Sequence, residues 1–114
     1  MRLARSFFLL TTLGIMLACD ASYFAYIRNE GTEPLTLGYS INGGREVRVT
    51  QSLAPGDVKT VGKVGGPGES PRIRVTAYDA RGEAVFCRDF SYEEYRLSGP
   101  TAPIGIRGGH LDCR

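Results

Sequence analysis

Alternation of apolar and polar side chains constrains this 114-residue chain more than any other feature. Along residues 35–41 and 73–77 every odd position is apolar, and along 47–53 most odd positions are apolar. Successive side chains of a strand point to opposite faces of a sheet, so a period of two predicts half-buried β-strands. The chain should therefore bury one face of several extended segments.

Turn-forming residues separate these segments. Asn42-Gly43-Gly44 can supply the positive φ angles of a tight hairpin, so residues 35–42 and 47–53 should pair antiparallel. Pro55 and Gly56 suit the central positions of a type II turn. Residues 79–82 turn the chain toward a strand over 84–90, and the glycine-rich segment 65–71 should be a mobile surface loop.

One helical turn is expected near the end of the chain. Ser91 and Glu94 match the capping box, which predicts a short helical turn over Tyr92 to Leu97. Adding strands at 23–28, 58–64 and 104–106 gives about seven strands. Short strands at this spacing, with glycine and proline between them, predict an all-β fold: a single small antiparallel β-sandwich.

Two segments are similar to a pattern in immunoglobulin-like and related sandwiches. In that pattern a polar bend, here residues 29–35, precedes an early strand, and a Pro-Gly turn, here residues 53–56, ends a later one. The resemblance implies an immunoglobulin-like sandwich. It implies no activity.

The amino terminus has the pattern of an export signal. Arg2 and Arg5 precede the apolar run 7–17, and Ala18 and Cys19 follow it. The apolar core is shorter than the roughly 20 residues of a membrane-spanning helix, which favours a cleaved signal. Residues 16–19, Met-Leu-Ala-Cys, resemble the lipobox of bacterial lipoproteins, although that family usually has Leu where this chain has Met16.

The lipobox resemblance implies that Cys19 receives a lipid and that residues 1–18 are removed. Residues 19–22 would then form a lipidated tether and residues 23–114 the β-sandwich domain. The rival interpretation is ordinary secretory cleavage after Ala21, with Cys19 and Ala21 as the small residues of the cleavage site. Residues 82–94 are also similar to a segment of uncharacterised small bacterial lipoproteins, a family that implies location and fold only.

The cysteine count supports the lipid interpretation. An odd count, here three, is unusual in an exported protein. Acylation of Cys19 leaves Cys87 and Cys113 as a pair in a compartment where disulfides persist. Closing the loop between them would stabilise the fold by about 3.5 kcal/mol in the chain-entropy model. The alternative is two buried thiols, although a cysteine next to the chain end would fray unless it were tied down.

Charge excludes nucleic acid as a partner. Without Arg2 and Arg5, the 14 basic residues of the chain fall to the number of acidic residues, 12. The two signs are interspersed, so no basic stripe could follow a phosphate backbone.

Catalytic and metal motifs are weak. His110 is the only histidine, which disfavours a Ser-His-Asp or Cys-His relay and a blue-copper site. His110, Asp112 and Cys113 could contribute to a metal site only if Cys87 were reduced, and an oxidising compartment favours the disulfide. The simpler interpretation of His110 is an exposed residue of the tail.

The remaining candidates have structural explanations. Glu94 is accounted for by the capping box, and its neighbour Glu93 would face another direction on a helical turn. Tyr92 and Tyr95 could serve as corner tyrosines that donate a hydroxyl to the backbone, as in other sandwiches. The glycine-rich stretch 62–68 lacks the Lys-Ser/Thr ending of a phosphate loop.

The sequence therefore predicts a non-enzymatic, lipid-anchored interaction or structural module of a bacterial cell envelope. It would be held at a membrane by its lipid and would bind another envelope protein or a glycan, through a loop cluster or an unpaired sheet edge. No cofactor is expected. The alternative is a small-ligand or metal carrier that uses the tail of residues 110–113.

Overall fold

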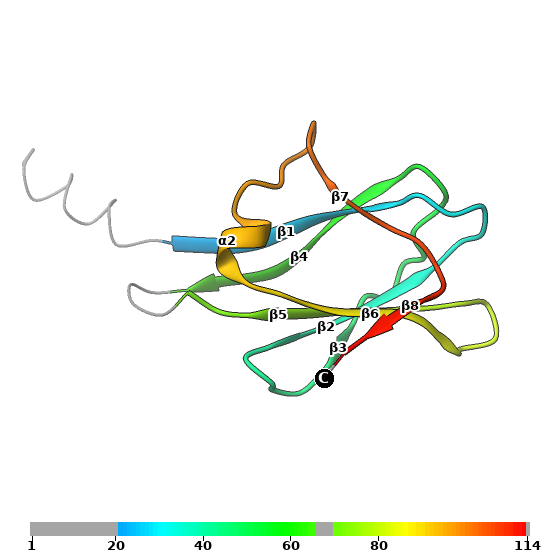
Figure 1. Ribbon diagram of the computed structural model, residues 1–114, viewed down its shortest axis with the longest axis horizontal. Coiled ribbons are helices and arrows are strands. Elements are labelled where there is room, and N and C mark those ends of the chain that lie inside the picture. Colours follow the sequence, from blue (N-terminus) through cyan, green and yellow to red (C-terminus); the bar gives the residue numbers. More distant parts are fainter. Residues whose placement is uncertain (1–20, 66–69, 114) are drawn as a thin grey trace, which may run out of the picture.

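The computed structural model describes residues 21–65 and 70–113. The predicted signal, Cys19 and residues 66–69 of the predicted loop at 65–71 lie outside these residues. The described part contains eight strands and one short helix (Figure 1): β1 (Ala21–Asn29), β2 (Thr36–Ile41), β3 (Val47–Arg48), β4 (Val58–Gly65), β5 (Ile73–Tyr78), β6 (Ala84–Phe90), α2 (Tyr92–Tyr95), β7 (Ile104–Ile106) and β8 (His110–Asp112).

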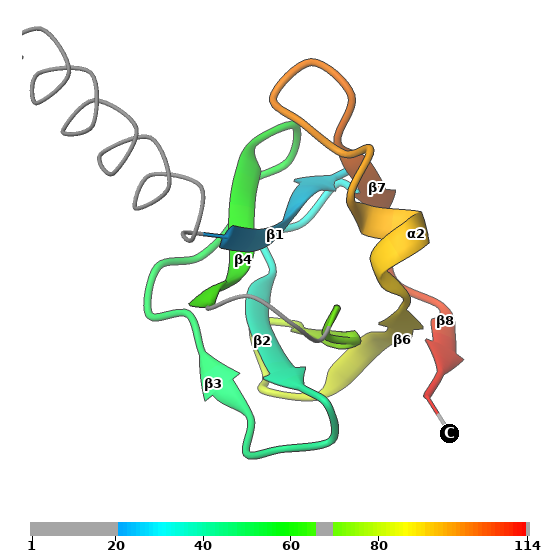
Figure 2. The same cartoon turned by 90° about the vertical axis from the view of Figure 1, so that its left-hand side faces the viewer.

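The strands form two sheets, which Figure 2 shows from one end of the molecule. One sheet has three strands in the order β4-β1-β7, and the other has five in the order β3-β2-β5-β6-β8. Most neighbouring strands are antiparallel, but β7 is parallel to β1 and β8 is parallel to β6. The predicted all-β, sandwich-like fold is confirmed, with the last two strands added in parallel to opposite sheets.

The core lies between the two sheets. On β1 the inward positions are Tyr23, Ala25 and Ile27, and β5 contributes Ile73, Val75 and Ala77. Gly62 on β4 has a φ of 145°, and a Cβ there would overlap the carbonyl oxygen of Tyr23. Only glycine therefore permits β4 to approach β1 this closely.

The predicted turns are confirmed. Asn42 and Gly43 both have positive φ, at 49° and 74°, as a tight hairpin turn requires. Gly56 has a φ of 84°, and Asp57 N donates to Ala54 O at 3.0 Å across the Pro-Gly turn. Gly56 and Asp57 both lie opposite Asn29, as in a β-bulge: Gly56 N donates to Asn29 O at 2.7 Å, and Asn29 N donates to Asp57 O at 3.1 Å.

The second strand of the first hairpin is shorter than predicted. The strand covers Val47 and Arg48 instead of residues 47–53, and Val49 N adds one further hydrogen bond to β2, at Leu37 O, at 2.8 Å. Leu53 pairs with Leu35 in a single isolated β-bridge. The side chain of Leu53 is 1% exposed, whereas that of Val47 is 49% exposed. The difference arises because this segment must cross from the edge of the five-stranded sheet to β4 in the other sheet, so it cannot follow β2 throughout.

Three tyrosines fill the end of the sandwich near Ala21. Tyr92 contacts the rings of Tyr23 and Tyr95 edge-on, with centroids 5.7 and 5.6 Å apart. Tyr95 is 1% exposed, and its hydroxyl donates to Pro71 O at 2.7 Å. Burial raises the pKa of Tyr95 to about 12. The corner role predicted for a tyrosine of this helix is confirmed for Tyr95.

The helix and the tail complete the fold. Both halves of the capping box are present, but the helix ends at Tyr95, two residues before the predicted Leu97. Cys87 and Cys113 lie within disulfide distance, with Cα atoms 5.3 Å apart. Strand β8, which the sequence did not predict, precedes Cys113 directly. In residues 21–65 and 70–113, no helix has the length and hydropathy of a transmembrane span.

Candidate functional site

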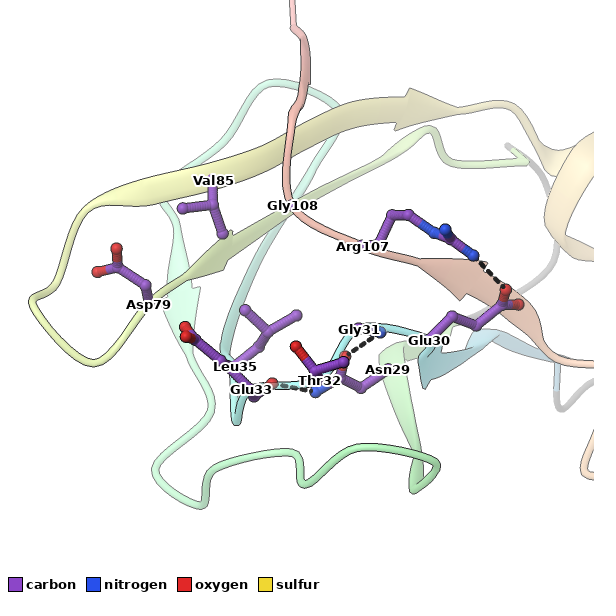
Figure 3. A pocket seen from close by; sticks show the side chains of 10 residues that line it. All are labelled: Asn29, Glu30, Gly31, Thr32, Glu33, Leu35, Asp79, Val85, Arg107 and Gly108. Carbon is purple, nitrogen blue, oxygen red and sulfur yellow. Dashed lines mark hydrogen bonds and ion pairs between the residues drawn. The ribbon is translucent and has the colours of Figure 1, made fainter.

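Three loops meet at the end of the sandwich opposite Ala21 (Figure 1). They join β1 to β2, β5 to β6 and β7 to β8, and they enclose a pocket of about 340 Å³. Figure 3 shows the ten lining residues: Asn29, Glu30, Gly31, Thr32, Glu33, Leu35, Asp79, Val85, Arg107 and Gly108. We call this the loop pocket.

Asn29 organises the first loop from beneath. Its side chain is fully buried, and its amide nitrogen donates to Glu33 O at 2.7 Å and to Leu53 O at 2.9 Å. Its amide oxygen accepts from Gly31 N at 2.9 Å. One buried side chain therefore fixes the loop that carries Thr32 and Glu33 and ties it to the chain before β4.

Asp79 organises the second loop in a similar way. Its carboxylate accepts from Arg81 N at 2.9 Å and from Glu83 N at 3.0 Å. Gly82 N donates to Asp79 O at 3.0 Å and closes the turn, in which Gly82 has a φ of 80°. The turn is therefore held by hydrogen bonds rather than by apolar packing.

An ion pair forms the opposite wall. Arg107 lies 3.6 Å from Glu30, and Glu30 N donates to Ile106 O at 2.8 Å. The Glu30 side chain lies across Gly105, where a Cβ would overlap it. Glycine at position 105 thus allows Glu30 to reach Arg107.

The pocket combines an apolar base with charged walls. Figure 3 shows Leu35 and Val85 between two sets of charges, Glu33 with Asp79 on one side and the Glu30–Arg107 pair on the other. Among the described residues Glu33 makes no side-chain hydrogen bond or ion pair, so its carboxylate is available to a partner. Such a site can bind a polar or cationic group whose apolar part rests on Leu35 and Val85.

The predicted tail residues lie elsewhere. His110 and Asp112 are exposed and line a separate hollow of about 280 Å³ together with Arg88 and Arg107. Cys113 is directed to Cys87. No group of three or more His, Cys, Asp or Glu side chains in residues 21–65 and 70–113 is arranged to hold a metal ion. The carrier alternative remains a prediction.

The two glutamates of the helix are engaged in separate interactions. Ser91 N donates to Glu94 at 3.0 Å, and this hydrogen bond is the main cause that lowers the pKa of Glu94. Glu94 also pairs with Arg88 at 2.8 Å, and Glu93 pairs with Arg96 at 2.8 Å. The two carboxylates do not converge on a common site.

Sequence reasoning missed the loop pocket. Residues 29–35 and 79–82 were identified as a bend and a turn, without a binding role, and Arg107 was not singled out. The sequence does give a partial signal for the pocket. Because successive strands of an antiparallel sandwich run in opposite directions, these two connections are expected at the same end of it. The third loop could not be placed, because β8 was not predicted.

Comparison with known proteins found no match: no family model, no curated protein and no solved structure is significantly similar to this chain. The resemblance to immunoglobulin-like sandwiches and to bacterial lipoproteins therefore stays a prediction.

Proposed function

We propose that this protein is a lipid-anchored, non-enzymatic binding module of a bacterial cell envelope. In this proposal Cys19 carries the lipid, and the loop pocket binds a protein or glycan at the end of the domain away from the anchor. The observation that carries the proposal is the position of β1. This strand begins at Ala21, two residues after Cys19, and runs toward the loop pocket.

The register of β1 favours cleavage before Cys19 over the secretory alternative. Ala21 pairs with Gly65 at the start of the β1–β4 ladder. Cleavage after Ala21 would remove this paired residue, whereas cleavage before Cys19 leaves the strand whole. The Cys87 and Cys113 side chains, within disulfide distance, also fit an oxidising compartment.

The chemistry of the pocket supports binding rather than catalysis. The only histidine of the chain, His110, does not line the loop pocket. Asp79 is already held by two backbone amides, and Arg107 is paired with Glu30. Of the charged side chains that line the pocket, only Glu33 is free to act as a general base, and no second free titratable group stands beside it to complete a relay.

Replacement of Cys19 tests the anchor. We expect Cys19→Ser to move the full chain from the membrane fraction to the soluble extracytoplasmic fraction, because the acylated thiol is lost. Cys113→Ser is the matched control, since it removes a thiol without touching the signal, and it should stay with the membrane. Membrane retention of the Cys19→Ser chain would refute the lipid anchor.

Charge reversal tests the pocket. Chemical crosslinking in intact cells, followed by purification, should capture a partner with the unmodified chain and lose it with Glu33→Lys. Glu83→Lys is the matched control, because Glu83 is an exposed acid of the neighbouring turn that does not line the pocket. Equal capture by both variants would show that the loop pocket is not the binding site.

A further inference from the structure

On strands β1 and β4 the outer face of the three-stranded sheet is aromatic and carries little charge, whereas at the β7 edge the Glu30 side chain lies across Gly105 and pairs with Arg107. On β1 the outward positions are Phe24, Tyr26 and Arg28, because the positions between them face the core. Their register partners on β4 are Gly62, Thr60 and Val58. At these six positions Arg28 is the only charge, and there is no carboxylate.

The segment between α2 and β7 extends the same face. Ser98 Oγ accepts from Tyr26 N at 3.1 Å, which holds this segment beside β1. Pro100 lines a hollow of about 570 Å³ with Tyr26, Val58, Thr60 and Lys59, whose ammonium donates to Gln51 Oε1 at 3.1 Å. Figures 1 and 2 both show the segment on the side of β1 away from the five-stranded sheet. Leu97, at its start, is 70% exposed.

The outer face of the five-stranded sheet is built differently. Arg74 and Asp89 pair across it at 2.7 Å. Tyr78 donates to Glu46 at 2.7 Å, and the Arg48 guanidinium lies 3.5 Å from the centre of the Tyr78 ring. This face is covered by a charged network, which is typical of a surface in contact with water.

Chain length sets how far the aromatic face can be from the lipid. Two residues of chain span at most about 7 Å, whatever their conformation, so Ala21 lies within that distance of a lipidated Cys19. The headgroup layer of a bilayer is about 5–7 Å thick on each side. A lipidated Cys19 would therefore place the start of β1 at the level of the headgroups.

We propose that the outer face of the three-stranded sheet, with Leu97 at its border, rests on the lipid surface. This inference depends on the proposed lipidation of Cys19. Tyr and Phe side chains favour the membrane interface, and Arg28 suits anionic headgroups. The charged face of the five-stranded sheet then points to water, and the loop pocket remains open at the side.

Two exposed leucines provide a matched pair of reporters. The chain has no tryptophan, so Leu97→Trp and Leu111→Trp each introduce a single indole. Leu111 is 61% exposed and lies opposite Cys87 in the five-stranded sheet. The lipidated full-length variants would be placed in phosphatidylcholine–phosphatidylglycerol vesicles containing lipids brominated in the upper acyl chain, after flotation has established that they bind.

We expect severalfold stronger quenching and a blue-shifted emission for Leu97→Trp than for Leu111→Trp. Tyr26→Trp, a second reporter on β1 itself, should behave like Leu97→Trp. If the variants float with the vesicles but both leucine positions are quenched equally, the lipid anchor is supported and the proposed membrane contact of the three-stranded sheet is refuted. Failure to float would remove the anchor, and the present proposal with it.

Discussion

At the end of the sandwich near Ala21, three tyrosines fill the space between the sheets, whereas at the opposite end one buried asparagine holds the first loop of a pocket. The first end relies on apolar area and aromatic contacts, with Tyr95 as its centre. The second relies on hydrogen bonds from Asn29 to backbone atoms. Backbone hydrogen bonds fix a loop without using its outward side chains, so residues such as Glu33 are left for binding.

The largest expected effect is at the tyrosine end. Tyr95→Ala should lower the free energy of unfolding by about 3–5 kcal/mol, because it leaves a cavity between the sheets. Urea denaturation followed by circular dichroism measures this. Tyr95→Phe is the control: it keeps the ring but leaves Pro71 O unpaired, which should destabilise by about 1–3 kcal/mol. An alanine variant as stable as the phenylalanine variant would contradict the packing role.

At the pocket end, Asn29→Ala should destabilise by about 2–4 kcal/mol, since two carbonyls and one amide lose their partner. Proteolysis should then begin in residues 30–35. Thr32→Ala, a change at an exposed neighbour in the same loop, should stay within about 0.5 kcal/mol of the parent. Equal stability of the two variants would mean that Asn29 does not organise the loop.

Alkaline pH separates the two ends. The folded-state pKa of Tyr95, about 12, is above the ordinary value of 10.0. The contribution of the neutral Tyr95 phenol to the free energy of unfolding is therefore complete below pH 10 and is lost as the pH rises toward 12. The loss should approach roughly 2–3 kcal/mol. A pH titration followed by absorbance at the phenolate band should show one late-titrating tyrosine in the parent chain that is missing in Tyr95→Phe. Titration of Tyr95 at the ordinary value of 10.0 would argue against its burial.

The smallest effect is expected at the helix cap. Ser91→Ala should destabilise by about 1 kcal/mol, because the amide of Glu94 loses its side-chain acceptor. Thermal unfolding measures the shift. Ser52→Ala, an exposed serine outside any cap, is the control and should leave the melting temperature nearly unchanged. A cap variant as stable as this control would show that tyrosine packing alone positions the helix.

The features that sequence predicted best depend on neighbouring residues. The turns at Asn42-Gly43 and Pro55-Gly56 require particular φ angles, and the capping box joins atoms three residues apart. Cys87 and Cys113 were paired by counting, and the structure places them within disulfide distance. These inferences need no knowledge of how the sheets are arranged.

The features that sequence missed depend on which strands meet. Val47 and Leu53 share a period-two face, yet only Leu53 is buried, because the chain leaves β2 between them. Asn29 looks like an ordinary bend residue until Leu53 and Glu33 are brought beside it. The loop pocket likewise needs β7 and β8 to enter opposite sheets, which no local pattern specifies.

The parallel pairing of β1 with β7 has a consequence for biogenesis. Ile27 lies beside Ile104, so the earliest described strand acquires one of its two neighbours from nearly the last. When the chain is made from its amino end, the edge of β1 that pairs with β7 therefore has no hydrogen-bond partner until residues 104–106 have emerged. Truncated or stalled products that end before Ile104 would share this open edge and should be prone to self-association.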